Sequence, residues 1–335
     1  MLNERNRIHM KNQTSKVLIT GGAGQIGSEL TTSLRALYGS DRVIMSDIRN
    51  DIKTELRESG PYEILDVTDP RAVAALLDKY DIDTIYHMSA ILSANGEKNP
   101  QLAWNVNING THNILEAARE KKVSRLFIPS SIAAFGPETP RDDTPQETIL
   151  LPKTMYGVTK VAGELLCDYY VMHYGMDIRG CRYPGIISYE TLPGGGTTDY
   201  AVAIFYGAVK DKTYTCFVKE DTTLPMMYMP DCLKATIDLM EADYTRLKHH
   251  SGFNLAGMSF TVGELAAEIK KHIPEFTCRY QPDYRQAIAD SWPRTIDDSA
   301  ARTEWDWKPA YDLASMTVDM LRVLRQRHAE GRLSG

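Results

Sequence analysis

Cysteine is scarce in this sequence, and long apolar runs are absent. The five cysteines form no C-x-x-C pair, and the eight histidines show no H-E-x-x-H spacing. These absences argue against a disulfide framework and a zinc site, and they predict reduced thiols, as in an intracellular enzyme. No apolar stretch approaches the roughly 18 residues of a membrane span. We therefore expect no metal centre and no membrane partner.

Positive charge is also in short supply. The chain carries 38 Lys and Arg against 44 Asp and Glu, a formal net charge of −6, and it shows no basic stripe. This balance argues against a nucleic-acid partner. With 335 residues, 43% of them hydrophobic, the chain is long enough for one large globular domain or two fused ones.

The first 15 residues form a segment of different composition, which we predict to be a flexible leader. They include Arg5, Arg7 and Lys11 but only one acid, Glu4, and they lack the apolar core of a secretory signal. Two interpretations stay open. The segment is either a short mitochondrial presequence or a disordered leader with no targeting role.

A glycine-rich loop follows the first apolar segment, residues 17–20. Gly21, Gly24 and Gly27 form a G-x-x-G-x-x-G pattern, and the residues after it have a helical pattern up to position 37. Between a strand and a helix, such a loop turns tightly and lets backbone approach a pyrophosphate. The helix N-terminus then offers N–H groups and a positive dipole end to the phosphates. The pattern predicts a dinucleotide site.

Acidic residues follow the second and third predicted strands. Asp47 comes directly after the strand at residues 42–46, where a carboxylate accepts hydrogen bonds from the adenosine ribose and repels a 2′-phosphate. NAD is therefore favoured over NADP, although Arg49 lies close by. Asp66 follows the strand at residues 62–65. Two interpretations of Asp66 are equally open: contact with the adenine edge, or the N-cap of the next helix.

Small residues follow the fourth predicted strand, residues 84–88. The segment 89–93 is suited to lying against a cofactor. A long helix is predicted over residues 104–121, and it contains Asn105, Asn107 and Asn109. Asparagine is costly inside a helix unless its amide finds partners, so we expect these side chains to be bonded.

Tyr156 and Lys160 lie four residues apart in a helix predicted over residues 155–174. At this spacing the two side chains share a face, and the lysine cation can lower the pKa of the phenol from about 10 toward neutrality. General acid–base catalysis requires a group poised near the working pH. Ser131 ends the fifth predicted strand, residues 123–129, at the edge where parallel sheets gather ligands, so its hydroxyl could meet the same substrate oxygen.

Strands and helices alternate up to a sixth strand near residues 177–183, which is followed by the break at Pro184 and Gly185. This order predicts an α/β fold with a doubly wound parallel Rossmann sheet. We assign residues 16–185 to the NAD-binding domain and residues 186–328 mainly to a smaller substrate-binding lobe, with some return to the first domain. Residues 329–335 are expected to form a tail.

Together, the glycine loop, Asp47, Ser131 and the Y-x-x-x-K pair resemble the extended short-chain dehydrogenase/reductase superfamily, over about residues 16–325. Strings at residues 193–200, 224–228 and 285–293 resemble the short-chain type of L-threonine 3-dehydrogenases more closely. Some of these relatives have threonine at the position of Ser131, and either hydroxyl can serve.

The resemblance implies NAD-dependent oxidation of L-threonine at Cβ to L-2-amino-3-oxobutanoate, the first step of its degradation to glycine and acetyl-CoA. Tyr156 would take the hydroxyl proton, and Lys160 would hold the phenolate and bind the nicotinamide ribose. Ser131, together with Ser93, would orient the substrate. The implied cofactor contacts are Gly21, Gly24, Gln25, Ile26, Gly27, Asp47, Asp66, Val67, Met88, Ser89, Ala90, Asn107, Tyr156, Lys160 and Ile186.

For the substrate's ammonium and carboxylate, the resemblance implies Gly196, Thr197, Thr198 and Asp199. The alternative is that this loop is only the start of a helix. The resemblance also implies a homodimer formed through helices 105–121 and 155–174. Combined with the basic leader, it suggests a mitochondrial location, with the cytoplasm as the alternative.

Two rival functions stay open. A nucleotide-sugar epimerase or dehydratase on the same fold would need a pocket for a nucleoside diphosphate, and the sequence shows no further basic phosphate-binding group. A non-catalytic NAD-sensing regulator would not need Tyr156 and Lys160. The zinc-dependent type of threonine dehydrogenase is excluded because its Cys and His ligands are missing.

Overall fold

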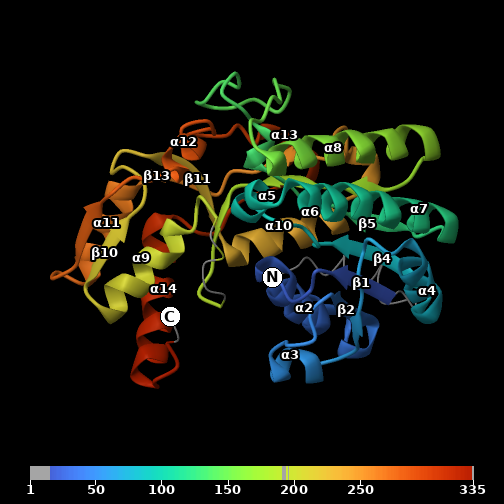
Figure 1. Cartoon of the computed structure of the whole chain (residues 1–335), viewed down its shortest axis with the longest axis horizontal. Helices are drawn as coiled ribbons and strands as arrows, with labels where there is room; N and C mark the ends of the chain where they lie inside the picture. The colour runs from blue at the N-terminus through green and yellow to red at the C-terminus, as the bar shows by residue number, and fades with distance from the viewer. Residues whose placement is uncertain (1–15, 191–193, 195, 334–335) are drawn as a thin grey trace.

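The computed structural model describes residues 16–190, 194 and 196–333. Our expectation for the leader therefore lies outside the described residues. Figure 1 shows two parts of the chain side by side. In one part a sheet is flanked by helices, drawn mostly in blue to green. The other part contains the yellow, orange and red helices α9, α11 and α14.

A six-stranded parallel sheet forms the first part, with the strand order β3-β2-β1-β4-β5-β7. The order runs outward from β1 in both directions, so the topological switch lies between β1 and β4. The prediction of a doubly wound parallel sheet is confirmed. The strands are β1 (Lys16–Thr20), β2 (Val43–Asp47), β3 (Tyr62–Ile64), β4 (Ile82–His87), β5 (Arg125–Phe127) and β7 (Ile178–Arg179).

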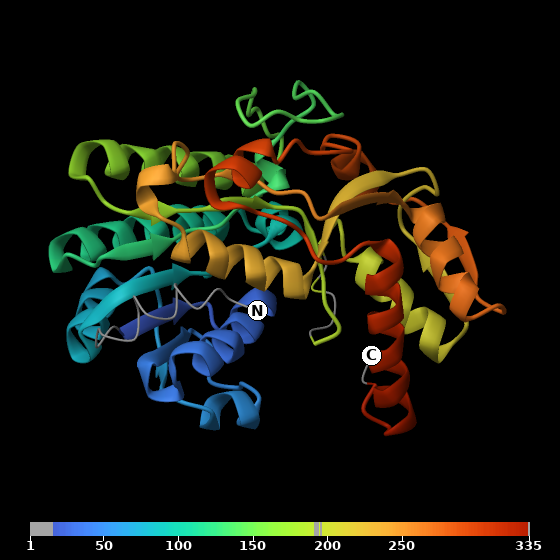
Figure 2. The same cartoon turned by 180° about the vertical axis from the view of Figure 1, so that it is seen from behind.

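Helices cover both faces of this sheet because its strands are apolar on both sides. In β1, Leu18 packs into one apolar cluster, whereas Val17 and Ile19 pack into another on the opposite face. The Leu18 face is covered by α4 (Pro70–Tyr80), α7 (Thr111–Lys121) and α8 (Met155–Tyr174). The other face is covered by α2 (Gln25–Tyr38) and α10 (Met229–Glu241), which lie next to each other in the back view of Figure 2.

Helix α8 has clear boundary signals at both ends. The hydroxyl of Thr154 accepts a hydrogen bond from the Gly157 backbone N–H, and Gly175 ends the helix in the left-handed region with φ 63°. Threonine at the N-cap and glycine after the last turn are preferred at these places. The prediction of a helix over residues 155–174 is confirmed.

The prediction of one regular α-helix over residues 104–121 is wrong. Helix α6 (Pro100–Trp104) is followed by a π-helical segment, Asn105–Gly110, and then by α7. Three asparagines and a glycine have low α-helix propensity, which favours a departure from α geometry here. The π segment buries Asn107 and aims its amide at Ile91 and Thr159. Such π turns often occur at functional sites.

The second part of the chain is built around another apolar cluster, which includes Met226 and Trp292 and also takes in Phe135 and Tyr156 of the first part. It contains α9 (Tyr200–Lys210), α11 (Val262–His272) and α14 (Leu313–Ala329). A sheet in the order β13-β11-β9 and the pair β10-β14 complete it. These strands are β9 (Gly185–Ile187), β10 (Thr213–Cys216), β11 (Thr223–Tyr228), β13 (Met258–Thr261) and β14 (Thr277–Tyr280).

Some later elements pack back onto the first part. Phe253 of β12 (Phe253–Asn254) and Trp305 of α13 (Ser299–Trp305) join the cluster under α2 and α10. Strand β12 extends a third small sheet, β12-β8-β6, with β8 (Cys181–Tyr183) and β6 (Ser130–Ser131). The remaining helices are short: α3 (Thr54–Glu58), α5 (Ser93–Lys98) and α12 (Arg285–Ala289).

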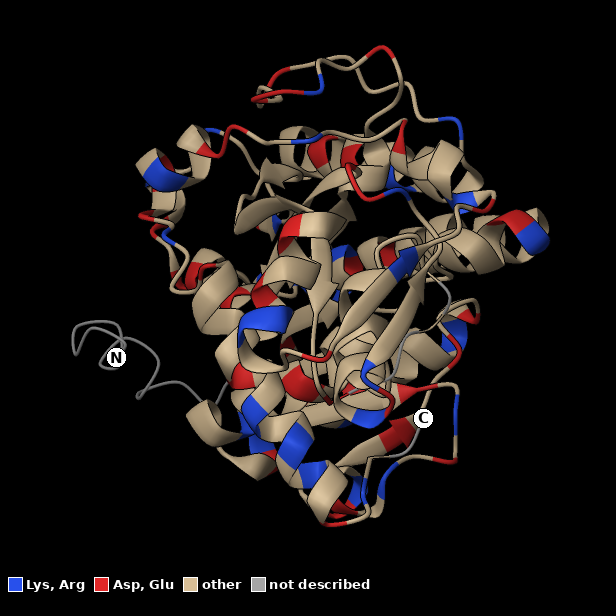
Figure 3. Ribbon diagram, turned by 90° about the vertical axis from the view of Figure 1, so that its left-hand side faces the viewer, with Lys and Arg blue, Asp and Glu red and all other residues tan. Residues whose placement is uncertain are grey.

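Charged side chains are spread over the whole fold. Figure 3 shows Lys and Arg interspersed with Asp and Glu along the elements. Within the described residues, no helix is both long enough and apolar enough to cross a bilayer.

Candidate active site

The loop between β1 and α2 is shaped by close backbone contacts. Gly21 has φ +65°, and a Cβ there would lie 2.6 Å from the backbone nitrogen of Ser89. A Cβ on Gly27 would lie 2.3 Å from the carbonyl oxygen of Gly21. Because the atoms in the way belong to backbone, neither position accepts a side chain without moving the loop. The loop therefore turns as tightly as its sequence predicts.

The start of α2 fits a pyrophosphate. Gly24 is the N-cap and supplies no side-chain cap, and the first turn contains no acidic residue. The backbone N–H groups of the first turn, which begins with Gln25 and Ile26, thus form an anion site at the positive end of the helix dipole. A Cβ on Gly24 would also lie close to backbone, 3.2 Å from the Gly21 carbonyl oxygen. This geometry is a cradle for the phosphates of NAD.

Asp47 ends β2 beside this cradle and is 8% exposed. Its Oδ2 accepts a hydrogen bond from the Ala23 N–H at 3.0 Å, and its Oδ1 accepts one from the Arg49 N–H at 3.1 Å. The position at the end of the neighbouring strand is the one from which an acid contacts the adenosine ribose. The Arg49 guanidinium pairs with the same carboxylate at 3.5 Å and bonds the Ala23 carbonyl.

The structure separates the two interpretations of Asp66. Helix α4 is capped by Asp69, whose carboxylate accepts hydrogen bonds from Arg71 and Ala72. Asp66 is exposed and bonds only locally, to the N–H and hydroxyl of Thr68. The helix-cap interpretation of Asp66 is therefore wrong, and adenine contact stays a prediction. Val67 is buried next to it and packs with α4 and α7.

Met88, Ser89 and Ala90 follow β4 and are half-buried beside the glycine loop, where Met88 N–H bonds the Thr20 carbonyl. Asn107 holds the end of this segment. Its Oδ1 accepts from the Ile91 N–H at 2.7 Å, and its Nδ2 donates to the Ile91 carbonyl and to the Thr159 hydroxyl, both at 3.0 Å. Asn107 is thus a brace between the 88–91 segment and α8, and its direct contact with the cofactor stays a prediction.

Tyr156 and Lys160 share one face of α8, as predicted, and the Lys160 Nζ lies 5.5 Å from the centroid of the tyrosine ring. The pKa of the phenol differs from our expectation, because burial raises it to about 12, and a hydrogen bond with Ser131 opposes that rise. Burial also lowers the pKa of Lys160 to about 8. Its ammonium donates to the Pro129 carbonyl at 2.7 Å rather than to the phenol. Burial therefore shifts both pKa values toward the neutral forms of the two side chains.

The three proposed catalytic side chains meet at the carboxyl end of the sheet. Ser131, in β6, is half-buried and accepts a hydrogen bond from the Ala133 N–H at 3.2 Å in addition to its bond with Tyr156. Ser93, the first residue of α5, is 7% exposed. The meeting of Ser131 and Tyr156, distant in sequence, confirms that the two predicted elements converge.

The loop before α9 lies against strand β9. Thr198 reaches β9, where a Cβ on Gly185 would lie 2.8 Å from it, and β9 also carries the half-buried Ile186. The Asp199 Oδ2 accepts a hydrogen bond from the Gly196 N–H at 2.7 Å, which closes the turn. Thr197 is almost fully buried. The four predicted substrate contacts are thus on one compact turn, although the roles we assigned to them stay predictions.

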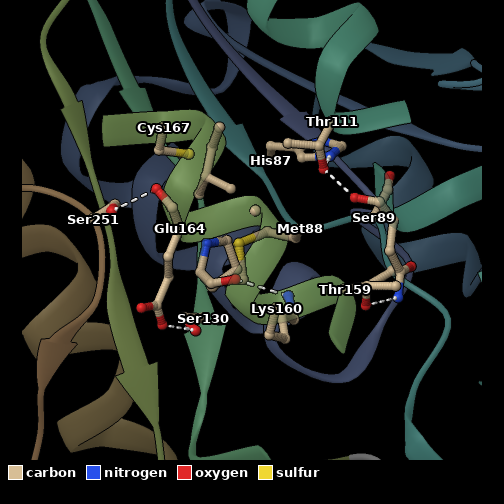
Figure 4. Close-up of a pocket in the computed structure, with 15 residues that line it drawn as sticks. His87, Met88, Ser89, Thr111, Ser130, Thr159, Lys160, Glu164, Cys167 and Ser251 are labelled. Atoms are coloured by element: carbon tan, nitrogen blue, oxygen red, sulfur yellow. Dashed lines mark hydrogen bonds between the residues drawn. The ribbon is translucent and has the colours of Figure 1, made fainter. Parts of the chain in front are cut away.

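Behind Lys160 lies a polar group that sequence reasoning missed. A cavity of about 30 Å³ separates Lys160 from His87, and Glu164 and Ser130 also line it (Figure 4). Glu164 follows Lys160 by one helical turn, so the i, i+4 spacing was a visible signal. Nothing in the sequence, however, marks this acid as buried. Among the described residues, no group of three or more His, Cys, Asp or Glu side chains could hold a metal ion.

Comparison with known proteins agrees with this geometry. Residues 17–256 match the NAD dependent epimerase/dehydratase family. An uncharacterized epimerase/dehydratase of Staphylococcus haemolyticus is 50% identical over 93% of this chain and 98% of its own length. The holo form of a GalE-like L-threonine dehydrogenase from Cupriavidus necator is 51% identical, with a TM-score of 0.90, over 92% of this chain and 99% of that one.

A third similar protein is a monomeric L-threonine 3-dehydrogenase from a metagenome, in its apo form. It is 47% identical, with a TM-score of 0.89, and the match covers 92% of this chain and 99% of that one. The family match, the glycine cradle and Asp47 identify NAD as the cofactor. The chain belongs to the NAD-dependent epimerase/dehydratase family of extended short-chain enzymes and is an NAD-dependent oxidoreductase.

Proposed function

We propose that this protein oxidises the β-hydroxyl of L-threonine to L-2-amino-3-oxobutanoate, the first step of threonine degradation to glycine and acetyl-CoA. One observation supports the proposal most strongly: two L-threonine dehydrogenases are 51% and 47% identical in sequence to this protein over 92% of the chain, which includes the substrate-binding lobe. The lobe matters because the Rossmann half is common to many reactions, whereas the residues that cover the substrate select the alcohol.

In this reaction Tyr156 acts as the general base. Bound NAD supplies the acceptor for the hydride that leaves the substrate carbon. The phenolate of Tyr156 takes the hydroxyl proton, and the Lys160 ammonium stabilises the phenolate, since a cation within about 4–6 Å favours the charged form. The Ser131 hydroxyl, already bonded to Tyr156, orients the substrate oxygen. Ser93 is a second candidate for this orienting role.

The turn before α9 recognises the amino-acid end of the substrate. Asp199 supplies a carboxylate for the ammonium, and Thr197, Thr198 and the backbone of Gly196 supply donors for the carboxylate. The contact between Thr198 and Gly185 supports this assignment, because it brings the turn to the strand that carries Ile186.

A nucleotide-sugar epimerase or dehydratase is the main rival, since the family name covers both reactions. The two functions differ in their substrates, so one panel separates them. We expect absorbance at the NADH band to rise with NAD and L-threonine. We expect a smaller rise with L-allo-threonine and L-serine, and none with UDP-sugars. If the protein turns over a UDP-sugar and not L-threonine, the rival function is correct and the proposed threonine oxidation is wrong.

The central test is Tyr156→Phe. This change removes the proton acceptor but leaves the ring, so we expect loss of at least about a thousandfold in kcat with NAD affinity nearly unchanged. Tyr174→Phe, at the exposed end of the same helix, is the matched control and should keep full activity. Full activity of Tyr156→Phe would rule out the proposed base, and loss of NAD binding by that variant would point to a structural role.

We also propose a homodimer in which α7 and α8 of two copies pack together. Support comes from apolar side chains on the outer side of α8: Leu165 is 66% exposed and Met172 is 75% exposed. Sedimentation equilibrium should give twice the chain mass of 37.6 kDa, and a monomer would exclude the dimer. Location in mitochondria is a further proposal, and imaging of the full chain fused to a fluorescent protein tests it.

A further inference from the structure

A buried ion pair lies directly behind the catalytic lysine. Glu164 of α8 and Arg182 of β8 are 7% and 6% exposed, and they form a two-pronged contact. The Arg182 Nε donates to Glu164 Oε1 at 3.0 Å, and Nη2 donates to Oε2 at 2.8 Å. The other guanidinium nitrogen donates to the Gln146 carbonyl and to Asn254 Oδ1. Each charge is therefore paired and hydrogen-bonded, as burial requires.

This ion pair also holds the strand that carries Ser131. The Ser130 hydroxyl donates to Glu164 Oε1, and Figure 4 shows this bond next to Lys160. Strand β6 pairs with β8 so that Ser130 lies opposite Arg182. The carboxylate thus joins α8, β6 and β8 at one point. A shift of Glu164 would move Ser130 and, with it, the neighbouring hydroxyl that contacts Tyr156.

Lys160 is surrounded by few other charges. On its own helix it faces Glu164, Cys167 and Tyr156, and from neighbouring strands it faces Cys181 of β8 and His87 of β4. Burial keeps His87 and both thiols neutral near pH 7: the pKa of His87 is lowered to about 3, and the thiol pKa values are raised above their usual range. Glu164 is therefore the one carboxylate, among the described groups that act on Lys160, that favours its ammonium form.

We propose that Glu164 is a positioning residue for the reaction proposed above: held by Arg182, its carboxylate keeps Lys160 in the ammonium form and fixes the strand that presents Ser131. Lys160 needs this support, because burial alone favours its neutral amine and a neutral amine does not stabilise the Tyr156 phenolate. Arg182 acts through Glu164 by holding the carboxylate in place, and it contacts neither Lys160 nor Tyr156 in the structure.

Competitive acylation of the full-length protein measures the Lys160 amine without any substrate. Labelling of Lys160, followed by mass spectrometry across pH, should give a midpoint near 8 in the wild type. In Glu164→Gln we expect this midpoint to fall by about one pH unit, because the neighbouring anion is removed. An unchanged midpoint in a folded Glu164→Gln protein would overturn the proposal.

Two further variants separate charge from folding. Glu164→Gln leaves the Arg182 cation buried without its partner. The double variant Glu164→Gln/Arg182→Met removes both charges, and it should lower the Lys160 midpoint in the same direction but by less, because no unpaired cation remains beside the ammonium. Asp177→Asn is the matched control. It breaks the ion pair with the buried Arg179, at 2.7 Å, which does not act on Lys160. Asp177→Asn should lower the unfolding temperature and leave the Lys160 labelling midpoint unchanged. If it shifts this midpoint as much as Glu164→Gln does, the effect of Glu164→Gln is due to general destabilisation and the proposal is wrong.

Kinetics then connect Glu164 to catalysis. With L-threonine and NAD, the alkaline limb of kcat/KM in Glu164→Gln should move down by about one pH unit, and the loss of activity should grow as the pH rises, because less Lys160 is in the ammonium form. A loss of the same size at every pH would mean a structural role only. If the wild-type protein does not oxidise L-threonine, the proposed function fails, whereas the labelling midpoint still decides the role of Glu164.

Discussion

Two glycine-rich loops precede helices in this protein, and they offer groups of opposite charge to a ligand. In the loop before α2, glycines are required because an added Cβ would lie as close as 2.3 Å to backbone atoms. The helix start has no side-chain cap and no acidic residue. In the loop before α9, Gly194 has open space around it, and the Asp199 carboxylate closes the turn by accepting from Gly196. The first loop therefore suits an anion. The second already holds the Asp199 carboxylate at the helix start, and this carboxylate is the group that we propose for the substrate ammonium.

The comparison teaches that glycine content alone does not identify a phosphate site. The deciding features are what a Cβ would meet and which charge stands at the helix start. Substitutions in the two loops should consequently impair the protein in different ways.

The largest effect is expected for Gly27→Ala. The new Cβ would lie 2.3 Å from the Gly21 carbonyl oxygen and 2.9 Å from the Gly22 Cα, so the cradle must open. We expect NAD affinity, measured by calorimetry, to fall at least about a hundredfold, because a misplaced loop loses several charge-assisted hydrogen bonds. Gly163→Ala on α8 is the control, because no neighbouring atom lies within 4 Å of the added Cβ there. This variant should keep normal NAD affinity. Normal NAD binding by Gly27→Ala would refute the cradle.

A smaller and more selective effect is expected in the second loop. Asp199→Asn keeps the shape and the acceptor for the Gly196 N–H but removes the charge. We expect KM for L-threonine to rise by about 10- to 100-fold, the range of one hydrogen bond to a charged group, while NAD affinity stays normal. Asp211→Asn, exposed at the other end of α9, should change neither value. An unchanged KM would leave Asp199 with only the role of closing the turn.

The same contrast explains what the sequence could predict. The cradle is local: its strand, glycines and helix are contiguous, and Asp47 lies at a fixed offset, so pattern and chemistry together locate it. The convergence of Ser131 with Tyr156 follows from sheet topology. The buried pair of Glu164 and Arg182 depends on burial, which charge and spacing do not reveal. The pKa of Tyr156 was predicted in the wrong direction for the same reason, because desolvation outweighs the opposing hydrogen bond with Ser131.

Local rules also failed where polar residues found distant partners. The asparagines of residues 105–109 correctly suggested bonded amides, but not a π-helical turn, whose shape depends on the contacts of Asn107 with Ile91 and Thr159. For the cap of α4, by contrast, a local signal was present: Pro70 at the first helical position favours Asp69, the residue before it.

The smallest predicted effect concerns the contact that joins the two halves of the molecule. Glu29 of α2 accepts a hydrogen bond from the Ser188 hydroxyl at 2.6 Å, in a cleft of about 1010 Å³ between α2 and α14. Burial raises the pKa of Glu29 to about 7, opposed by the Ser188 bond and by the charges of Lys53 and Arg327, while Glu190 adds to the rise. The stabilising protonated form is fully present below the unfolded-state pKa of about 4.5 and is lost as pH rises through 7.

Glu29→Gln should therefore unfold at the same temperature as the wild type at pH 5 and at a higher temperature at pH 8. Each unit of pKa shift corresponds to about 1.4 kcal/mol, and partial exposure of the cleft reduces the full amount, so we expect a gain of about 1–2 kcal/mol at pH 8. Glu55→Gln, exposed across the same cleft, is the control and should show no such pH dependence. If Glu29→Gln is less stable than the wild type at pH 8, the charged carboxylate itself holds the halves together. In that case the two halves are joined by an electrostatic contact rather than by a hydrogen bond to a protonated carboxyl group.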